Sequence, residues 1–148
     1  MKNKCVVFDI DGTLLKSAFI LNELLEKNLK GKAKWDYFYA HCNSDKVKVV
    51  PCMREIIKEL VIKGYVPILS TARNEHNREA TIEKLHKEGI IFKELYMRQD
   101  GDYRPSAEVK KEHLISISEK YDIKFFMDDD VSNINMAKEL GIGTIQVP

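Results

Sequence analysis

Two kinds of apolar pattern alternate along the chain. Five short runs are rich in β-branched and aromatic residues and are bounded by turn-forming residues, which is typical of strands buried on both faces. Between them lie longer segments whose apolar residues recur at the spacing of an amphipathic helix. The predicted strands are residues 5–10, 66–71, 93–97, 123–127 and 143–147.

Glycines support the ends of three predicted helices, because each follows within two residues of the last helical position. The four helices are predicted at residues 53–63, 78–87, 107–120 and 132–140. Strands that alternate with helices predict an α/β fold, a Rossmann-like parallel sheet with helices on both faces. In such a sheet, functional side chains gather at the carboxyl ends of the strands.

Residues 14–50 interrupt this alternation. They contain an amphipathic helix predicted at 17–29, followed by the aromatic residues Trp35, Tyr37, Phe38 and Tyr39. A segment inserted after the first strand would lie over a site at the end of that strand, as a minimal cap or substrate wall. The alternative is a small aromatic core that only stabilises the insert, and the two interpretations are compatible. We therefore expect one domain over residues 1–148, with this small helical insert.

Composition argues against a disulfide-dependent fold, a strongly charged nucleic-acid or membrane binder, and a metal site of cysteines or histidines. A chain of 148 residues is long enough to bury a core without disulfides, and a net charge of +1 gives no overall attraction to nucleic acid or membrane, although a local basic patch remains possible. The three cysteines form no CxxC pair, and the histidines at 41, 76, 86 and 113 lack metal-ligand spacing and are expected on the surface.

The lengths of the apolar runs predict the cellular location of the chain. The first apolar run is too short for a signal peptide and ends in an acidic residue, and no run approaches the roughly 20 residues of a membrane helix. We therefore expect a cytoplasmic protein with no membrane contact.

Acidic, hydroxyl and basic side chains follow the predicted strands. Because the carboxyl ends of parallel strands meet at one edge of the sheet, we expect these side chains to lie together. The residues concerned, with Gly12 and Ala72 between them, are Asp9, Asp11, Gly12 and Thr13 at the end of the first strand, Thr71, Ala72 and Arg73 at the end of the second, Lys110 or Lys111 after the third, and Asp128, Asp129 and Asp130 after the fourth.

This set of side chains suits phosphoryl transfer, in which catalysis is mostly positioning and neutralisation of charge. Carboxylates from two strand ends can hold Mg²⁺, which prefers oxygen ligands. A threonine hydroxyl can donate to a phosphate oxygen, and a lysine supplies a compact positive charge. Gly12 permits a sharp turn that brings backbone N–H groups near a phosphate.

One segment that follows an apolar strand, Asp9-Ile10-Asp11-Gly12-Thr13, resembles the first motif of the haloacid dehalogenase superfamily of phosphatases. The resemblance implies that Asp9 is the nucleophile and that Asp11 is the general acid and base, with a backbone carbonyl that binds the metal. It also implies that Thr71 is the second-motif hydroxyl, that Lys110 or Lys111 is the third-motif lysine, and that Asp128 and Asp129 are metal ligands together with Asp9.

A closer resemblance, to the phosphatase domain of phage polynucleotide kinase and its small relatives, covers nearly the whole chain. It is based on residues 97–104, on Thr71-Ala72-Arg73, and on Val109-Lys110-Lys111-Glu112, which selects Lys110 as the motif lysine. Because arginine suits bidentate phosphate contacts, Arg73 and Arg104 are expected to contact the substrate phosphate or nucleotide, with Arg98 a weaker candidate. The alternative is that these arginines pair with Asp100 and Asp102 in a structural network.

Three positions depart from the pattern of that group. Asp130 replaces an arginine, Ser106 replaces an acid, and the apolar Phe19-Ile20-Leu21 stands where an arginine is found in the phage enzyme. These changes affect the substrate rather than the core chemistry. No Gly-x-x-x-x-Gly-Lys-Ser/Thr segment is present, so the chain has no kinase motif of that kind.

The sequence supports three functional hypotheses. The first is a Mg²⁺-dependent phosphomonoesterase that forms an aspartyl-phosphate and acts on a phosphorylated nucleic-acid end or nucleotide, preferably as a polynucleotide 3′-phosphatase. The second is a nucleotidase or small-metabolite phosphatase with the same chemistry. The third is a phosphate-binding module without turnover, against which the intact pair Asp9 and Asp11 argues. The sequence gives no oligomeric state.

Overall fold

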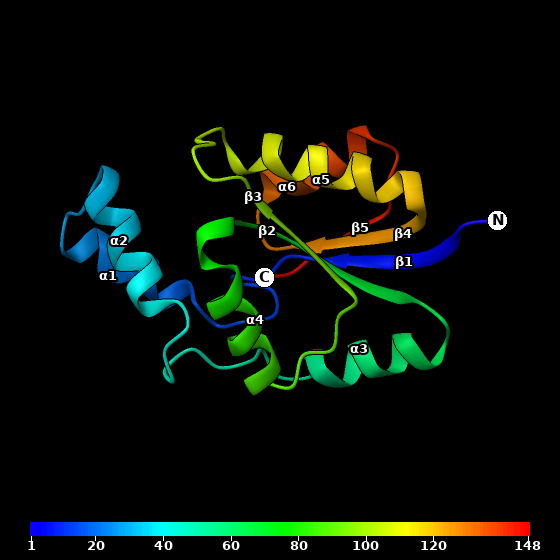
Figure 1. The fold of residues 1–148 in the computed structure, drawn as a ribbon, viewed down its shortest axis with the longest axis horizontal. Coiled ribbons are helices and arrows are strands. Elements are labelled where there is room, and N and C mark those ends of the chain that lie inside the picture. The colour runs from blue at the N-terminus through cyan, green and yellow to red at the C-terminus, as the bar shows by residue number, and fades with distance from the viewer.

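The computed structural model describes residues 1–148 as a single five-stranded parallel sheet with helices on both faces, which confirms the predicted α/β class (Figure 1). The strand order is β3-β2-β1-β4-β5, so the first strand lies at the centre. The strands are β1 (Asn3–Phe8), β2 (Val66–Asn74), β3 (Glu94–Arg98), β4 (Tyr121–Asp128) and β5 (Thr144–Gln146).

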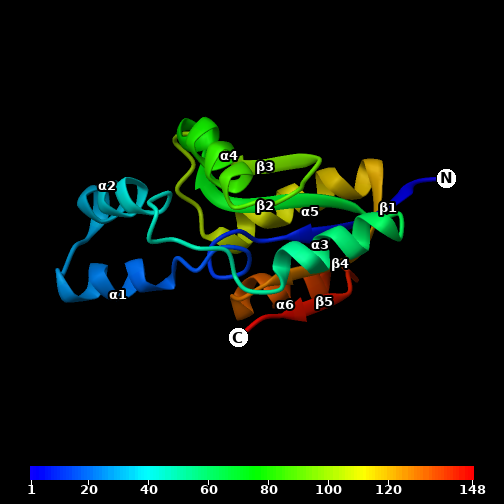
Figure 2. The same ribbon diagram turned by 90° about the horizontal axis from the view of Figure 1, so that it is seen from below.

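Helices α3 and α4 cover one face of the sheet, and α5 and α6 cover the other (Figures 1 and 2). The helices are α1 (Ala18–Glu26), α2 (Gly31–His41), α3 (Met53–Ile62), α4 (Arg78–Lys87), α5 (Ser106–Lys120) and α6 (Val131–Glu139), and a short 3-10 helix, η1 (Glu75–Asn77), precedes α4. None of the helices combines the length and the apolar character needed to cross a bilayer.

The two faces of β1 belong to two separate cores, because successive side chains of a strand point to opposite sides. Val6 and Phe8 pack in the core under α3 and α4, whereas Cys5 and Val7 pack in the core under α5 and α6. All four side chains are fully buried. This burial on both faces explains why the run reads as continuously apolar, and it fixes where the strand ends and the loop at Asp9 begins.

The insert folds as two helices that stand beyond the carboxyl ends of the strands (Figures 1 and 2). The predicted helix over 17–29 is found as α1, and the aromatic segment forms the additional helix α2. Ile20, Leu24 and Phe38 anchor the two helices, and all three belong to the same core as Val6 and Phe8. The aromatic residues are therefore partly a core, as one interpretation expected, but Trp35 stays half exposed.

All three cysteines are free. Burial raises the pKa of Cys5 to about 12 and that of Cys42 to about 11, so both stay protonated thiols at neutral pH. Neither is a reactive thiolate.

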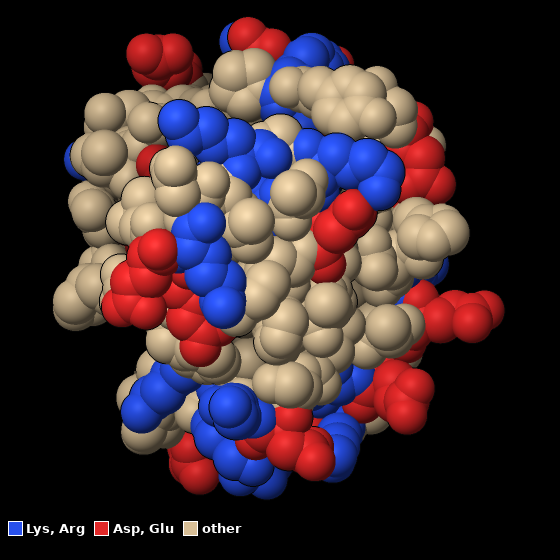
Figure 3. Space-filling model, turned by 90° about the vertical axis from the view of Figure 1, so that its left-hand side faces the viewer, with Lys and Arg blue, Asp and Glu red and all other residues tan.

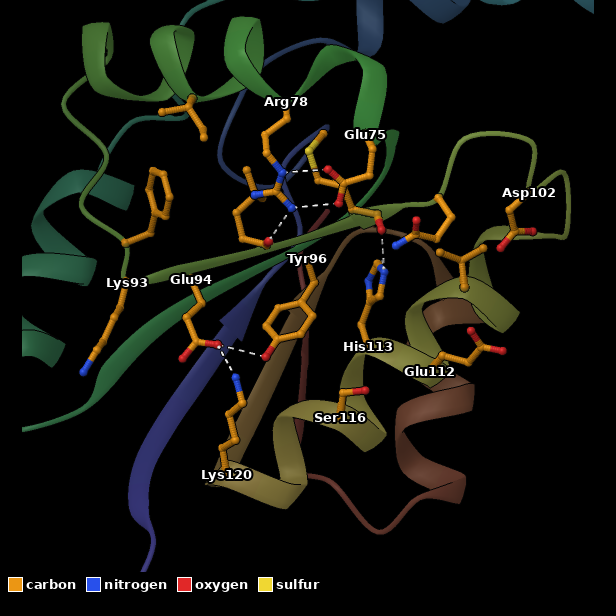
Figure 4. Close-up of a pocket in the computed structure, with 16 residues that line it drawn as sticks. Glu75, Arg78, Lys93, Glu94, Tyr96, Asp102, Glu112, His113, Ser116 and Lys120 are labelled. Atoms are coloured by element: carbon orange, nitrogen blue, oxygen red, sulfur yellow. Dashed lines mark hydrogen bonds and ion pairs between the residues drawn. The ribbon is translucent and has the colours of Figure 1, made fainter.

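The expectation that every histidine lies on the surface is wrong for His113. Its ring is buried between α5 and the sheet, where Nε2 donates to the Met97 carbonyl at 3.1 Å and Nδ1 accepts from the Ser70 hydroxyl at 2.8 Å. A carbonyl can only accept, so the neutral ring carries its hydrogen on Nε2. Together with Arg78, which donates to the Leu95 carbonyl at 3.0 Å, it covers outward carbonyls of the edge strand β3 (Figure 4).

This burial predicts an acid-sensitive contribution to stability. Burial lowers the pKa of His113 to about 4 from 6.5, so the unfolded chain binds the proton first as the pH falls. The contribution is fully present above pH 6.5 and is lost between pH 6.5 and pH 4, by about 3 kcal/mol at most. Urea unfolding at pH 7 and at pH 4 measures the prediction. The free energy of unfolding should fall less between these pH values in His113→Gln than in the wild type, and equal falls would contradict the prediction.

Candidate active site

The loop that follows β1 is a tight turn that presents carboxylates at the edge of the sheet. The Ile10 carbonyl accepts from the N–H groups of Thr13, Leu14 and Leu15 at 3.2, 2.9 and 3.0 Å. The N–H of Gly12 donates to the Leu15 carbonyl at 2.9 Å, so the amides of Gly12 and Thr13 hold the turn closed. These two amides were expected near the phosphate, but in this structure they are engaged within the loop.

Gly12 is required here for two reasons. Its φ is +83°, which lies in the left-handed region that favours glycine. A Cβ at this position would also lie 2.2 Å from Oδ2 of Asp129, which is too close for any side chain. The glycine therefore lets the loop after β1 and the loop after β4 approach each other.

Lys110 links the ends of β1 and β4. Its Nζ donates to Asp9 Oδ1 at 2.6 Å and to Asp128 Oδ2 at 2.8 Å, and all three side chains are buried. The second Asp9 oxygen, Oδ2, accepts from the buried Thr13 hydroxyl at 3.0 Å. Lys110 projects from α5 into the site, whereas its neighbour Lys111 is exposed to solvent.

Asp128 is oriented by groups from the start of α6. Its Oδ2 accepts from Asn133 Nδ2 at 3.0 Å, and its Oδ1 accepts from the N–H of Asp130 at 2.9 Å. Asn133 also donates to the Ser106 hydroxyl at 3.3 Å. The Asp130 side chain accepts from the N–H of Ser132 at 2.7 Å and caps α6. Two of the positions that depart from the family pattern, Asp130 and Ser106, therefore have structural partners here.

Negative charge exceeds positive charge at this edge of the sheet. Oxygens of Asp9, Asp128 and Asp129 lie within 4.8 Å of one another, and Lys110 is the one cation that contacts this group. Burial, reinforced by Asp128, raises the pKa of Asp9, although Lys110 acts in the opposite sense. Burial alone would lower the pKa of Lys110, but the two carboxylates outweigh it and keep the ammonium charged.

The three carboxylates and one ammonium leave a deficit of about two positive charges. A hard divalent cation with oxygen ligands offsets that deficit, so this donor set fits Mg²⁺. The same three residues were expected as metal ligands from the sequence. The structure brings their side chains together, with Asp129 the most exposed of them.

Asp11 and Arg73 form a separate ion pair beside this group. Arg73 Nε donates to Asp11 Oδ2 at 2.9 Å, and its Nη2 donates to Asp11 Oδ1 at 2.7 Å. The Ser17 hydroxyl, at the start of α1, donates to Asp11 Oδ1 at 2.8 Å. Burial favours the neutral acid, but Arg73 and Ser17 outweigh it and lower the pKa of Asp11. Asp11 is therefore held as a carboxylate in this structure.

The remaining donors of Arg73 are also occupied. Nη1 donates to Asn43 Oδ1 at 2.6 Å and to the Thr81 hydroxyl at 3.2 Å, and Nη2 reaches the Cys42 carbonyl at 3.3 Å. With its bonds to Asp11, the guanidinium uses all five N–H donors, and the residue is 2% exposed. Arg73 was expected to contact substrate, yet here it positions Asp11 and ties it to the insert.

The other second-motif residues lie on β2, which extends further than predicted. The buried Thr71 hydroxyl accepts from the N–H of Arg73 at 3.1 Å. The Ala72 carbonyl accepts from Arg98 Nε at 2.9 Å, and Arg98 also donates to the carbonyls of Asp102 and Arg104. Arg98 therefore supports the loop between β3 and α5.

Arg104 belongs to a network on the surface. It is exposed and pairs with Asp102 at 2.7 Å and with Glu112 at 2.5 Å. The alternative expected from the sequence was a structural network in which the arginines pair with Asp100 and Asp102. The pair of Arg104 and Asp102 agrees with that alternative. Asp100 instead accepts from the backbone N–H of His76 at 3.0 Å.

A small pocket of about 80 Å³ opens beside the carboxylates. Three residues of the insert form its apolar wall, and Asp11, Gly12 and Asp129 form its polar side. The insert residues are Ala18, Leu21 and Phe38, with Ser17 beside them. A larger hollow of about 690 Å³ lies elsewhere, along β3 between α4 and α5 (Figure 4). There Arg78 pairs with Glu75, and Lys120 lies 3.5 Å from Glu94.

Sequence reasoning did not identify several groups that orient the central side chains. Ser17 and Arg73 hold Asp11, Asn43 and Thr81 hold Arg73, and Asn133 holds Asp128. Of these, only Arg73 carried a signal, from its place after the second strand. The others are single polar residues that belong to no motif, and of these only Asn43 lies far in the sequence from its partner.

Comparison with known proteins agrees with this geometry. The chain is similar, at 30% identity and a TM-score of 0.77, to a chain of a Pnkp1/Rnl/Hen1 complex, covering 99% of this chain and 46% of that one. It thus spans less than half of that relative. A class C acid phosphatase from Bacillus anthracis shares the fold, with a TM-score of 0.75 at 18% identity over 100% of this chain and 67% of that one. The model of the HAD superfamily, subfamily IIIB (acid phosphatase), matches residues 1–148. The chain therefore belongs to this phosphatase family.

Proposed function

We propose that this phosphatase is a Mg²⁺-dependent phosphomonoesterase that works through an aspartyl-phosphate on Asp9. The observation that carries the proposal is the position of Asp9 at the end of the central strand. One of its oxygens is held by Lys110 and the other by Thr13, and the carboxylate of Asp11 lies two residues further along the same loop.

Asp9, Asp128 and Asp129 would hold the magnesium ion, together with the backbone carbonyl of Asp11. Mg²⁺ at this place supplies positive charge that offsets repulsion between an anionic nucleophile and an anionic phosphate. Lys110 adds a fixed positive charge on the same side, and it keeps Asp9 and Asp128 at a defined separation.

In the first step, an oxygen of Asp9 attacks phosphorus and the bond from phosphorus to the ester oxygen breaks. The leaving oxygen takes a proton from Asp11, which must leave its ion pair with Arg73 and take up a proton before this step, because that pair holds it as a carboxylate. In the second step, the Asp11 carboxylate takes a proton from water, which attacks phosphorus and breaks the bond to Asp9. The ion pair with Arg73 presents Asp11 as the carboxylate that the second step requires.

The remaining candidate residues have supporting roles in this proposal. The Thr71 hydroxyl, on β2, and Lys110, on α5, bind phosphate oxygens. Gly12, Thr13 and Ala72 shape the backbone around the phosphate. Arg104 is exposed and paired with Asp102 and Glu112, so it would contact substrate only after release of these partners.

We propose a 3′-phosphorylated polynucleotide as the substrate. The pocket of about 80 Å³ is much smaller than the roughly 300–1,000 Å³ of typical ligand pockets, so most of a nucleotide would lie outside it. An open site of this kind favours a large substrate. Similarity, at 29% identity, to a chain of a Pnkp1/Rnl/Hen1 RNA repair complex supports a nucleic-acid end. The acid phosphatase description of the family supports the alternative, a mononucleotide or other small phosphomonoester.

Phosphate release tests this proposal. The substrates are a 3′-phosphorylated oligonucleotide, the matching 5′-phosphorylated one and free mononucleotides, each with Mg²⁺ or with EDTA. We expect Mg²⁺-dependent release that is fastest from the 3′-phosphorylated oligonucleotide, and none from the Asp9→Asn variant. Preference for mononucleotides would replace the substrate assignment, and full activity in EDTA would contradict the metal requirement.

A further inference from the structure

Helices α1 and α2 leave large apolar side chains exposed next to the site. Leu21 is 53% exposed, Leu25 79% and Trp35 48%. Leu21 and Phe38 line the pocket that contains Asp11 and Asp129, and the Trp35 ring packs edge-on against Phe38 at 6.1 Å. An apolar surface therefore begins at the catalytic carboxylates and continues along the insert.

The contacts of the insert with the site show which end of each helix lies nearest to the carboxylates. The start of α1 touches the site through Ser17, and the residues just after α2 touch it through Asn43. Leu25 lies one helical turn beyond Leu21, and Trp35 lies about one turn beyond Phe38, so both residues lie further from the carboxylates.

The same segment carries the positive charge of the molecule. Residues 14–50 contain seven lysines and four acidic residues, an excess of three positive charges, while the whole chain has an excess of one. The rest of the chain is therefore net negative. Lys30 is exposed and directly precedes α2. Lys34 Nζ lies 4.9 Å from the centre of the Trp35 ring, and the first turn of α2 holds no acidic residue that would offset its positive dipole end.

This end of the molecule faces the viewer in Figure 3. Lys and Arg side chains lie above and below a central, largely uncharged area, and acidic side chains lie to its left and right and among the basic ones below it. Exposed aromatic and aliphatic surface flanked by lysines is the combination that binds single-stranded nucleic acid, because bases stack on the rings and phosphates pair with the ammonium groups.

We propose that the surface formed by Leu21, Leu25, Lys30, Lys34 and Trp35, the strand surface, binds the nucleotides next to the terminal phosphate of a single-stranded substrate. The inference rests on the proposed polynucleotide phosphatase activity. With the 3′-phosphate at Asp9, the preceding nucleotides pass Leu21 and Phe38, and a base stacks on Trp35. A second copy of the chain fits this surface less well, because a symmetric dimer would place the same lysines against one another.

The test compares kcat/KM on 3′-phosphorylated single-stranded oligonucleotides of increasing length with kcat/KM on the nucleoside 3′-monophosphate. The variants are Trp35→Ala, Trp35→Phe and the double variant Lys30→Gln/Lys34→Gln. The matched control is Lys58→Gln/Lys63→Gln, which removes two exposed lysines at α3. Circular dichroism verifies that every variant is folded.

We expect the wild-type ratio of oligonucleotide to mononucleotide kcat/KM to rise with length and to fall with salt. Trp35→Ala should lower this ratio by about 5- to 150-fold, the range that stacking of one base gives, and Trp35→Phe should restore part of it. The Lys30→Gln/Lys34→Gln variant should flatten the salt dependence, and the control should match the wild type.

Three results would overturn the inference, and they are distinguishable. If the wild type hydrolyses oligonucleotides but the variants keep its ratio and salt dependence, the strand surface is wrong and the proposed function stands. If the wild type hydrolyses no 3′-phosphorylated nucleic acid, both are wrong. If the wild type sediments as a dimer that Leu25→Asp dissociates, a second copy covers this surface.

Discussion

The Asp9→Asn variant should lose turnover by roughly 10⁴-fold or more, which is the order that removal of a covalent nucleophile costs. The amide retains the shape of the side chain, and it can still accept from Lys110 at the position of Oδ1. It lacks the anionic oxygen that forms the bond to phosphorus. Steady-state phosphate release with Mg²⁺ at saturating substrate measures the effect, and a variant within about tenfold of the wild type would exclude Asp9 as the nucleophile.

The same substitution should leave the fold at least as stable as the wild type without metal. Asp9 is 4% exposed, and burial beside Asp128 penalises its charge, as its raised pKa shows. A neutral amide removes that repulsion, while Lys110 keeps Asp128 as its partner. Urea unfolding in EDTA checks this expectation. A loss of stability of several kcal/mol would mean that the pair of Asp9 and Lys110 is needed for folding.

The Lys110→Met variant should lose both activity and stability. Methionine fills a similar volume without charge, so Asp9 and Asp128 would remain buried with no cation beside them. Removal of one partner of a buried ion pair costs about 3–5 kcal/mol, and loss of one group that stabilises charge in the transition state costs about 10²- to 10³-fold in kcat. Urea unfolding in EDTA and phosphate release measure the two effects.

Lys111→Met is the matched control, because Lys111 is the next residue of α5 and is exposed. It should leave kcat unchanged, and it should alter stability by no more than about 0.5 kcal/mol. An active, stable Lys110→Met variant would show that Lys110 is needed neither to neutralise Asp9 and Asp128 nor for catalysis. Asp9→Asn and Lys110→Met thus share the loss of activity and differ in the sign of the effect on stability.

The sequence predicted the sheet because its strands are buried on both faces. The run before Asp9 is continuously apolar, as a central parallel strand requires, and the carboxyl-end rule then places Asp9, Lys110 and Asp128 together. That fold and the phosphatase family are confirmed. The residue roles derived from the motifs stay predictions.

Other features could not be predicted because they depend on partners distant in the sequence. Helix α2 buries only Phe38, so it shows no repeating apolar face. Arg73 looks like a phosphate ligand by its residue type, but its five acceptors come from Asp11, the insert and α4. His113 has no motif, and only the packing of α5 on β2 and β3 reveals its buried position.

Asp9 should become phosphorylated during turnover, and trapping the aspartyl-phosphate tests this directly. The Asp11→Asn variant is mixed with Mg²⁺ and an aryl phosphate, whose leaving group needs no proton, then quenched in acid, digested and mapped by mass spectrometry. We predict that phosphate accumulates on Asp9, because the variant lacks the base that activates water, and that the Asp9→Asn/Asp11→Asn double variant carries none. Burst release of the aryl group with phosphate on another residue, or on none, would exclude Asp9 as the residue that is phosphorylated.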